Sequence, residues 1–353
     1  MRAESLDFFT RLVESPSPSG YEQPAAAAFR DYVAPFADSV ATNVMGSVHA
    51  LVKGTRSGPS VMLAGHIDEI GLMVSYITDQ GFLAFRAIGG VDAILLPGTR
   101  VRVHTKEGPL LGLLGRMPIH LLDEDERKAV PKLHKLFIDV GLDGDAVKDR
   151  VRLGDPVTFD VGFEEFGDGM AVSRGLDDKM GAFICAEVAR GVKEAGGAAG
   201  DLVVAATVQE EIGLRGGITS AFSVDPDVGI AVEVGHATDY PDVDKRRHGD
   251  VALGKGPILT RGANINPTVF ELLVEAAEAK ELLVQFDGEP RGTGTDANAM
   301  QLSRGGKAAG LVSVPLRYMH TPNEMLSLGD IEAAIELLTE FVLNLKPGTD
   351  FTP

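Results

Sequence analysis

The sequence has a single cysteine, no tryptophan and no long hydrophobic run. Because a disulfide needs two thiols, Cys185 cannot form one within the chain, and its apolar neighbours are typical of a buried structural thiol. No stretch approaches the ~18 apolar residues that a membrane-spanning helix needs. Glu4 and Asp7 stand where the apolar core of a secretory signal would lie. We therefore expect a cytoplasmic protein without a membrane partner.

Basic residues are also scarce, since 33 Lys and Arg face 51 Asp and Glu, which gives a net charge of −18. So acidic a surface repels phosphate backbones, and nucleic acid is not expected as a partner. Three catalytic motifs are absent as well: the phosphate loop G-x-x-x-x-G-K-[ST], the nucleophile elbow G-x-S-x-G and the zinc-binding H-E-x-x-H. These absences weigh against a P-loop enzyme and a serine hydrolase, and they exclude a zincin.

The chain is long enough, at 353 residues, for one large or two moderate domains. Between Gly71 and Glu164, short β-like runs follow one another with turns but without the helices of a parallel sheet. The exception is the charged stretch 123–134. We therefore expect a small β domain at 71–164, inserted into a larger domain formed by residues 1–70 and 165–353.

The larger domain alternates apolar runs with helical patterns. The apolar runs predict buried strands at 61–64, 202–208, 228–234 and 308–314. Helical spacing predicts helices at 6–13, 23–36, 178–193, 267–280, 296–303 and 330–345. Strands buried on both faces that alternate with helices favour an α/β fold, with three αβα layers and a largely parallel central sheet.

Polar residues gather where the predicted strands end. His66 and Asp68 follow the first of them, Glu210 and Glu211 follow the second, Glu233 and His236 follow the third, and His320 follows the fourth. In open α/β sheets, ligands bind beyond the carboxyl ends of the strands. Imidazoles and carboxylates that converge there would suit zinc, cobalt or manganese.

The spacing within these pairs suggests a division of labour. Two residues apart in extended chain, His66 and Asp68 share a face, so Asp68 can orient the His66 ring while the other ring nitrogen binds metal. One of the adjacent acids Glu210 and Glu211 can bind metal while its neighbour serves as a general base. Taken alone, His66 and Asp68 also fit a solvated pair at a strand end, and Glu210 and Glu211 also fit exposed acids that begin a helix. Asp177-Asp178 likewise fits acids at the N-terminus of a helix. The Gly-rich stretch 292–296 fits an anion site or a tight loop of the active site.

Taken in order, these stretches resemble the M42 metallo-aminopeptidases, of the glutamyl, leucyl and deblocking type. The similarity rests on Gly65-His66-Ile67-Asp68-Glu69, Gly175-Leu176-Asp177-Asp178-Lys179, Gln209-Glu210-Glu211-Ile212-Gly213, Gly294-Thr295-Asp296-Ala297 and Met319-His320-Thr321-Pro322. The inserted segments 120–122 and 137–141 also look like the family. The similarity therefore spans nearly the whole chain.

The resemblance implies two divalent ions, zinc or cobalt, in each subunit. Asp177 would bridge them, His66 and Glu233 would complete one ion, and Glu211 and His320 would complete the other. Glu210 would be the general base that activates a water, Asp68 would support His66, and the Asp177-Asp178 peptide would be cis. The reaction would be removal of the N-terminal residue from short peptides. Family members form dimers and often tetrahedral dodecamers through a PDZ-like inserted domain, which we expect at 71–164.

One position departs from the family, which usually has aspartate where this chain has Glu233. A glutamate reaches one methylene further and can still bind metal if the backbone retreats. His236 and Asp239 are the alternatives at this position. Two other functions stay open: a glycoside hydrolase, since paired carboxylates also cleave glycosides, and a shell protein without activity. The absence of tryptophan and the presence of only five tyrosines leave few rings for stacking on sugars.

Overall fold

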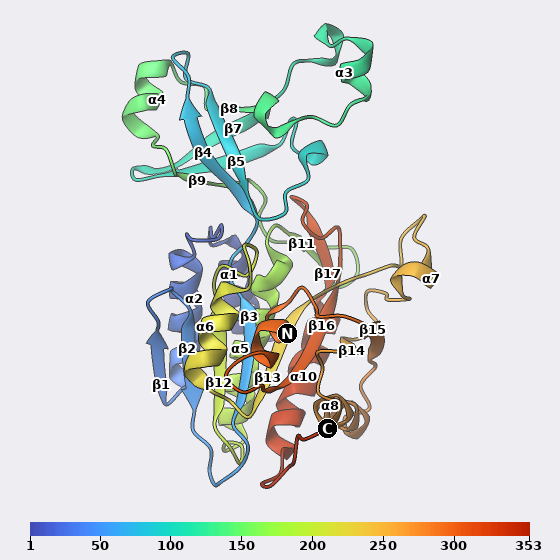
Figure 1. Cartoon of the computed structure of the whole chain (residues 1–353). Helices are drawn as coiled ribbons and strands as arrows, with labels where there is room; N and C mark the ends of the chain where they lie inside the picture. Colours follow the sequence, from blue (N-terminus) through green and yellow to red (C-terminus); the bar gives the residue numbers. More distant parts are fainter.

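The computed structural model describes residues 1–353 and contains two separate β-sheets, each with its own hydrophobic core. The larger sheet has 11 strands and lies in the lower part of Figure 1, whereas the smaller one closes into a barrel above it. None of the helices has both the length and the apolar character needed to cross a bilayer.

Four parallel strands form the centre of the larger sheet because their sequences are apolar on both faces. They are β12 (Leu202–Thr207), β3 (Val61–His66), β13 (Val228–His236) and β16 (Ala308–Arg317), side by side in this order. All six residues of β3 are buried. Their carboxyl ends meet at one edge of the sheet, as expected from the sequence.

Antiparallel strands flank this centre, so the sheet is mixed and not largely parallel as expected. They are β1 (Ser39–Thr42) and β2 (Val48–Val52) on one side, and β17 (Glu324–Ser327), β11 (Met170–Ser173) and β10 (Glu164–Phe166) on the other. A side branch pairs β14 (Ile258–Gly262) antiparallel with β16 and parallel with β15 (Gln285–Glu289). Several of these strands have exposed or alternating residues, so they lack the continuous apolar run that reveals a buried strand.

Helices cover both faces of the sheet, which gives the expected α/β architecture. The helices α5 (Leu176–Glu194), α1 (Ala3–Glu14), α2 (Gln23–Val33), α10 (Leu328–Asn344) and α8 (Pro267–Ala279) form one group of mutual contacts. The other group is the pair α6 (Arg215–Val224) and α9 (Asp296–Gln301). The short helix α7 (Lys245–His248) lies on an extension at the side of the domain (Figure 1).

The small barrel contains β4 (Gly71–Ile77), β5 (Leu83–Ile88), β8 (Phe137–Asp139), β7 (Gly108–Gly115), β6 (Arg100–Thr105) and β9 (Pro156–Phe159). It also carries α3 (Glu124–Lys128) and α4 (Gly144–Arg150). Four short 3₁₀ turns complete the secondary structure, at Ala34–Phe36, Ala93–Leu95, Ile119–Leu121 and Leu133–Lys135. The barrel core is a cluster of 15 buried residues distinct from the 61-residue core around the large sheet.

Two glycines let α5 approach the central strands closely. A Cβ on Gly65 of β3 would lie 2.3 Å from the backbone nitrogen of Ala182, and one on Gly181 would lie 2.0 Å from the carbonyl oxygen of Val232. No larger residue fits at either contact without a shift of the backbone. This close packing places the first turn of α5, with Asp177, beside the carboxyl end of β3.

Candidate metal centre

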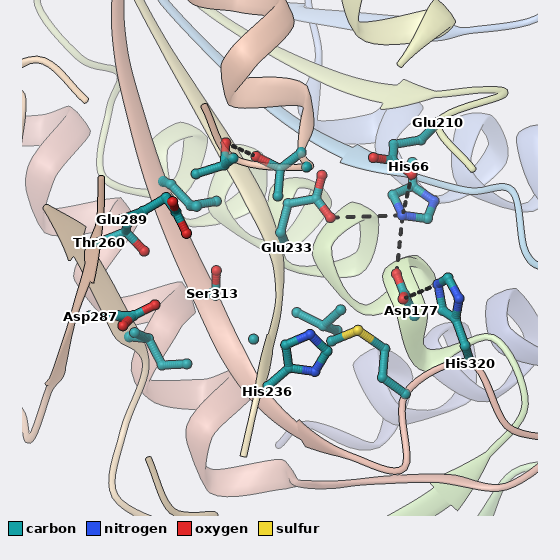
Figure 2. A pocket seen from close by; sticks show the side chains of 18 of the residues that line it. His66, Asp177, Glu210, Glu233, His236, Thr260, Asp287, Glu289, Ser313 and His320 are labelled. Carbon is teal, nitrogen blue, oxygen red and sulfur yellow. Dashed lines mark hydrogen bonds and ion pairs between the residues drawn. The ribbon is translucent and has the colours of Figure 1, made fainter. Parts of the chain in front are cut away.

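Six of the seven side chains expected at the site line one cavity of about 670 Å³. They come from five separate segments of the chain, which the parallel strands bring to one edge of the sheet (Figure 2). The six are His66, Asp177, Glu210, Glu211, Glu233 and His320. The seventh, Asp68, is completely buried behind them.

The His66 ring is held by the main chain and faces carboxylates. Its Nδ1 lies 3.0 Å from the carbonyl oxygen of Asp68. Its Nε2 lies 3.1 Å from Oδ1 of Asp177 and 3.7 Å from an oxygen of each of Glu210 and Glu233 (Figure 2). The ring is buried, so these acids are its only partners on that side.

His320 has the same arrangement on the other side of Asp177. Its Nδ1 lies 3.0 Å from the carbonyl oxygen of Gly90, in the segment that follows β5 of the barrel. Its Nε2 lies 3.4 Å from Oδ2 of Asp177 and 3.3 Å from Oε1 of Glu211. Asp177 therefore stands between the two rings, with one carboxylate oxygen toward each.

These contacts decide which ring nitrogen of each histidine is free. A carbonyl oxygen only accepts, so Nδ1 of His66 and of His320 must carry the proton. In a neutral imidazole, Nε2 then carries a lone pair that points at carboxylates, and a bound cation between them satisfies both sides. The donor set of nitrogen and oxygen atoms in two groups, His66 with Glu210 and Glu233 and Asp177 with Glu211 and His320, fits divalent metal.

Without such an ion, the protein must hold protons in its place. Burial lowers the pKa of His66, but Glu210, Asp177 and Asp68 outweigh it and raise that pKa well above its usual value. Hydrogen bonds to Asp177 and Glu211 raise the pKa of His320 to about 11. Burial raises the pKa of Asp177, but hydrogen bonds from His320 and His66 outweigh it and lower that pKa. The raised pKa values of the two histidines and the lowered pKa of Asp177 both have the direction expected of a site that stabilises positive charge.

Burial also shifts the pKa values of the two neighbouring glutamates, Glu210 and Glu211. Burial raises the pKa of Glu210 to about 8, with Asp296 and Asp177 adding to the effect and His66 opposing it. Burial likewise raises the pKa of Glu211, against the hydrogen bond from His320. Although adjacent, the two side chains belong to different groups of candidate ligands. The backbone turns there, with Gln209 at a φ of 57°.

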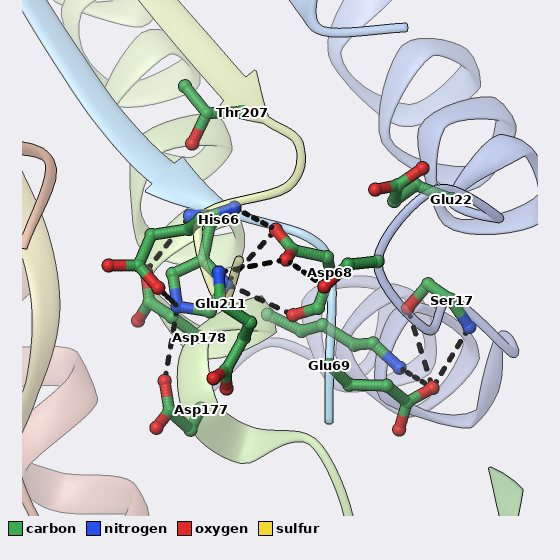
Figure 3. A network of polar contacts seen from close by, with 12 residues as sticks. Ser17, Glu22, His66, Asp68, Glu69, Asp177, Asp178, Thr207 and Glu211 are labelled. Atoms are coloured by element: carbon green, nitrogen blue, oxygen red, sulfur yellow. Dashed lines mark hydrogen bonds and ion pairs between the residues drawn. The ribbon is translucent and has the colours of Figure 1, made fainter. Parts of the chain in front are cut away.

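Asp68 is placed to hold this turn (Figure 3). Its Oδ1 accepts from the backbone nitrogen of Glu210 at 3.0 Å, and its Oδ2 accepts from that of Glu211 at 3.1 Å and from the Ser19 hydroxyl at 2.7 Å. Its carboxylate is 3.5 Å from Nδ1 of His66, further away than its own carbonyl oxygen. Asp68 therefore contacts His66 through its main chain and fixes the two glutamates through its side chain.

Glu233 lies inside β13 and not beyond it, since the strand continues to His236. Its side chain is nevertheless turned into the cavity toward His66 (Figure 2). Of the alternatives, Asp239 forms a two-pronged ion pair with Arg317 and accepts from the Leu253 backbone, so it is engaged elsewhere. His236 lines the cavity without contacting either group of acids.

Several residues that shape the centre were not among the candidate site residues chosen from the sequence. The buried Glu324 accepts from the backbone nitrogens of Asp177 at 3.1 Å and of His320 at 3.0 Å, so one carboxylate fixes two candidate ligands. Glu69 binds Arg174 and Lys179 behind the centre, and all three side chains are buried. A single acid or a buried ion triad of this kind is recognisable only in three dimensions.

The structure also shows the Asp177-Asp178 peptide and the Gly-rich stretch that were expected near the site. The Asp177-Asp178 peptide is cis, as expected. In the Gly-rich stretch, Thr293, Gly294 and Thr295 line the cavity, while Asp296 is buried and accepts from the Thr207 hydroxyl at 2.7 Å. This stretch therefore forms part of the cavity wall.

Comparison with known proteins gives matches over nearly the whole chain. The sequence profile described as M42 glutamyl aminopeptidase matches residues 46–337. A curated lysyl aminopeptidase of Pyrococcus furiosus is 36% identical over 357 residues, which cover 98% of this chain and 99% of that protein.

Solved structures of similar proteins have the same architecture. A TET aminopeptidase from a marine sediment archaeon of the Thaumarchaeota superposes with a TM-score of 0.92 at 34% identity, covering 97% of this chain and 96% of the other. The TET1 peptidase of Pyrococcus horikoshii, described as assembling into a tetrahedron or a large octahedral shell, gives a TM-score of 0.85 at 28% identity. That match covers 97% of this chain and 100% of the other.

Proposed function

The chain belongs to the M42 family of peptidases, and we propose that it is a metal-dependent aminopeptidase that removes the first residue from short peptides by hydrolysis. The observation that carries this proposal is the pair of imidazoles, the buried His66 and the partly exposed His320, whose Nε2 atoms face carboxylates from two sides, with Asp177 between them.

We assign two divalent ions to the centre, zinc or cobalt, which accept nitrogen and oxygen donors. His66 and Glu233 would hold one ion, Glu211 and His320 would hold the other, and Asp177 would contribute to both. When bound, such ions supply a water of lowered pKa and polarise the carbonyl group of the scissile bond.

Glu210 is assigned the role of general base. Its side chain is 11% exposed, more than the 5% of Glu211 and the 4% of Glu233, so a water in the cavity can reach it. It takes a proton from the attacking water and returns it to the nitrogen of the leaving amine. Asp68 positions this base through the backbone of the turn, and the free amino group of the substrate binds within the acidic centre, which favours exopeptidase action.

We further propose that residues 71–164 act as a PDZ-like dimerisation domain of a catalytic unit formed by 1–70 and 165–353, and that dimers build a tetrahedral dodecamer. The barrel supports this because it exposes large apolar side chains on one stretch of chain, namely Leu111, Leu113, Met117, Ile119, Leu121 and Val130. Light scattering of the purified protein tests it, and a monomer would contradict it.

The activity is tested with a panel of short peptides with free and blocked N-termini. We expect release of N-terminal residues that stops after chelation and returns with zinc or cobalt. A glycoside hydrolase would instead cleave a β-glucan without any metal, and a shell protein without activity would release nothing under any condition.

A further inference from the structure

The cavity that contains the candidate metal centre continues away from it to a second acidic wall. Asp287 and Glu289, both on β15, lie at the end opposite His66, Asp177 and His320 (Figure 2). Nothing in the proposed hydrolysis requires these two acids. They line the same continuous cavity as the candidate ligands, so a substrate whose amino group binds at the centre has room to extend its first side chain toward them.

Strand register places the residues between the two walls on one face of the sheet. Glu233 on β13 pairs with Ser313 on β16, Ser313 pairs with Ile258 on β14, and Thr260, two residues further along β14, pairs with Asp287 on β15. Three steps of about 4.8 Å between strands and two residues along β15 separate the backbones of Glu233 and Asp287 by about 16 Å. Only a long side chain can reach across this floor from the centre to the outer acids.

The outer acids have no cation of their own. Neither forms an ion pair with lysine or arginine, and no lysine or arginine lines the cavity. Asp287 accepts only from the backbone nitrogen of Gly288, and Glu289 only from that of Arg291. Two divalent ions would balance the four carboxylates of the centre, Asp177, Glu210, Glu211 and Glu233. The charges of Asp287 and Glu289 would remain uncompensated.

Two hydroxyl groups on the floor also lack partners. Thr260 and Ser313 are 5% and 4% exposed, line the cavity, and donate or accept no side-chain hydrogen bond within the protein. Neither hydroxyl oxygen is sealed from the cavity, so both are available to a ligand with polar hydrogens. Ile258 and Leu311 beside them offer an apolar surface to a methylene chain.

We infer that this cavity selects peptides whose first residue is lysine or arginine, with Asp287 and Glu289 as the residues that determine this specificity. The inference rests on the aminopeptidase function proposed above. The methylene stem of the substrate side chain packs on Ile258 and Leu311, and its charged end donates to the two carboxylates and the floor hydroxyls. An N-terminal glutamate or aspartate is repelled by the same wall.

The test compares substrates that differ only in the terminal charge. We expect kcat/KM to be at least 10-fold higher for lysyl than for norleucyl p-nitroanilide, and for arginyl than for citrullyl p-nitroanilide. In the double variant Asp287→Asn/Glu289→Gln, we expect the lysyl-to-norleucyl ratio to fall by about 10- to 100-fold, the range for lost charge-assisted hydrogen bonds. The double variant Glu275→Gln/Glu278→Gln, at two exposed acids on α8 and with the same charge change, is the control and keeps the wild-type ratio.

The outcomes separate this inference from the proposed function. Preferred cleavage of norleucyl or leucyl substrates, or a ratio unchanged in the double variant, would leave the aminopeptidase standing and overturn the specificity. If the metal-loaded protein cleaves no substrate, the function fails, and calorimetric binding of lysine amide against norleucine amide still tests the cavity. Equal affinity for the two amides would then refute the inference.

Discussion

At the residue scale, the notable feature of the centre is that both imidazoles are oriented by main-chain carbonyls. Asp68 and Gly90 supply these acceptors to His66 and His320, and the acids of the centre are left to face the Nε2 atoms. The position of a backbone carbonyl depends on the course of the chain and not on residue type. Spacing in the sequence therefore predicted a carboxylate as the partner of the His66 ring, whereas the carbonyl of the same residue is the closer group.

Glu210→Gln tests the assignment of the general base. An amide cannot take a proton from water, so we expect kcat to fall by about 10²- to 10⁴-fold while the protein keeps its metal. Activity is measured on a peptide substrate and metal content by elemental analysis of the same sample. Loss of metal together with activity would make Glu210 a ligand beside His66 and Glu233, and an active variant would refute the assignment altogether.

Glu22 gives a prediction for pH that does not involve the candidate ligands. It is 3% exposed, and burial raises its pKa from 4.5 to about 7 although Gly20 donates a backbone hydrogen bond to it. The folded protein therefore binds more protons than the unfolded one between these pH values. The free energy of unfolding should fall by about 3 kcal/mol from this group as pH rises through them.

Glu22→Gln removes the carboxyl group whose ionisation lowers the free energy of unfolding, and it keeps an oxygen that accepts from Gly20. We expect the variant to be more stable than the wild type at pH 8 and equal to it or less stable at pH 4.5, with metal present throughout. Urea unfolding at both pH values measures the difference. The same dependence on pH in both proteins would show that Glu22 is not the titrating group.

At the scale of elements, the predictable parts were those whose pattern is long and apolar. The helices at 6–13, 178–193 and 330–345 correspond to α1, α5 and α10, and the four apolar runs became the central strands. The polar edge strand β15, with the sequence QFDGE, has three exposed residues and could not be found in this way. The centre was foreseen because parallel strands share a carboxyl edge, but the outer wall of the cavity was not, since β15 forms it.

The close packing of α5 on β3 can be tested with Gly65→Ala. The added methyl group meets the backbone of α5 at 2.3 Å, so helix and strand must separate. We expect a loss of about 1–3 kcal/mol in the free energy of unfolding, and weaker metal binding because Asp177 opens this helix. Urea unfolding and metal content report the two effects.

Gly305→Ala is the matched control, since no heavy atom lies within 4 Å of a Cβ at that position. The interpretation fails if Gly65→Ala and this control behave alike.

At the scale of the whole molecule, the barrel and the large sheet meet at the candidate metal centre. The carbonyl oxygen of Gly90, which follows a barrel strand, holds His320, which follows β16. A Cβ on Gly89 would lie 3.2 Å from Oε2 of Glu211, so the same segment also closes over the second candidate ligand. The barrel therefore contributes directly to one half of the centre.

Gly90→Ala tests this contact between the two parts. Its Cβ would lie 2.8 Å from Nδ1 of His320, so the ring must turn away from the carbonyl that orients it. We expect 10- to 100-fold weaker affinity for one of two ions, the usual effect of losing such a support. Metal content after dialysis against a graded series of chelator concentrations measures it, again beside Gly305→Ala. Two ions held as tightly as in the wild type would show that the barrel does not support the centre.

The distribution of the candidate ligands along the chain also bears on when the protein becomes active. His66 is the first of them to be synthesised, and His320 is the last. Proteins are synthesised from the N-terminus, and their first segments begin to fold before the last exist. A growing chain thus lacks part of the candidate metal centre until His320 has been made. This order of synthesis delays the proposed peptide cleavage until all the segments that supply the candidate ligands exist.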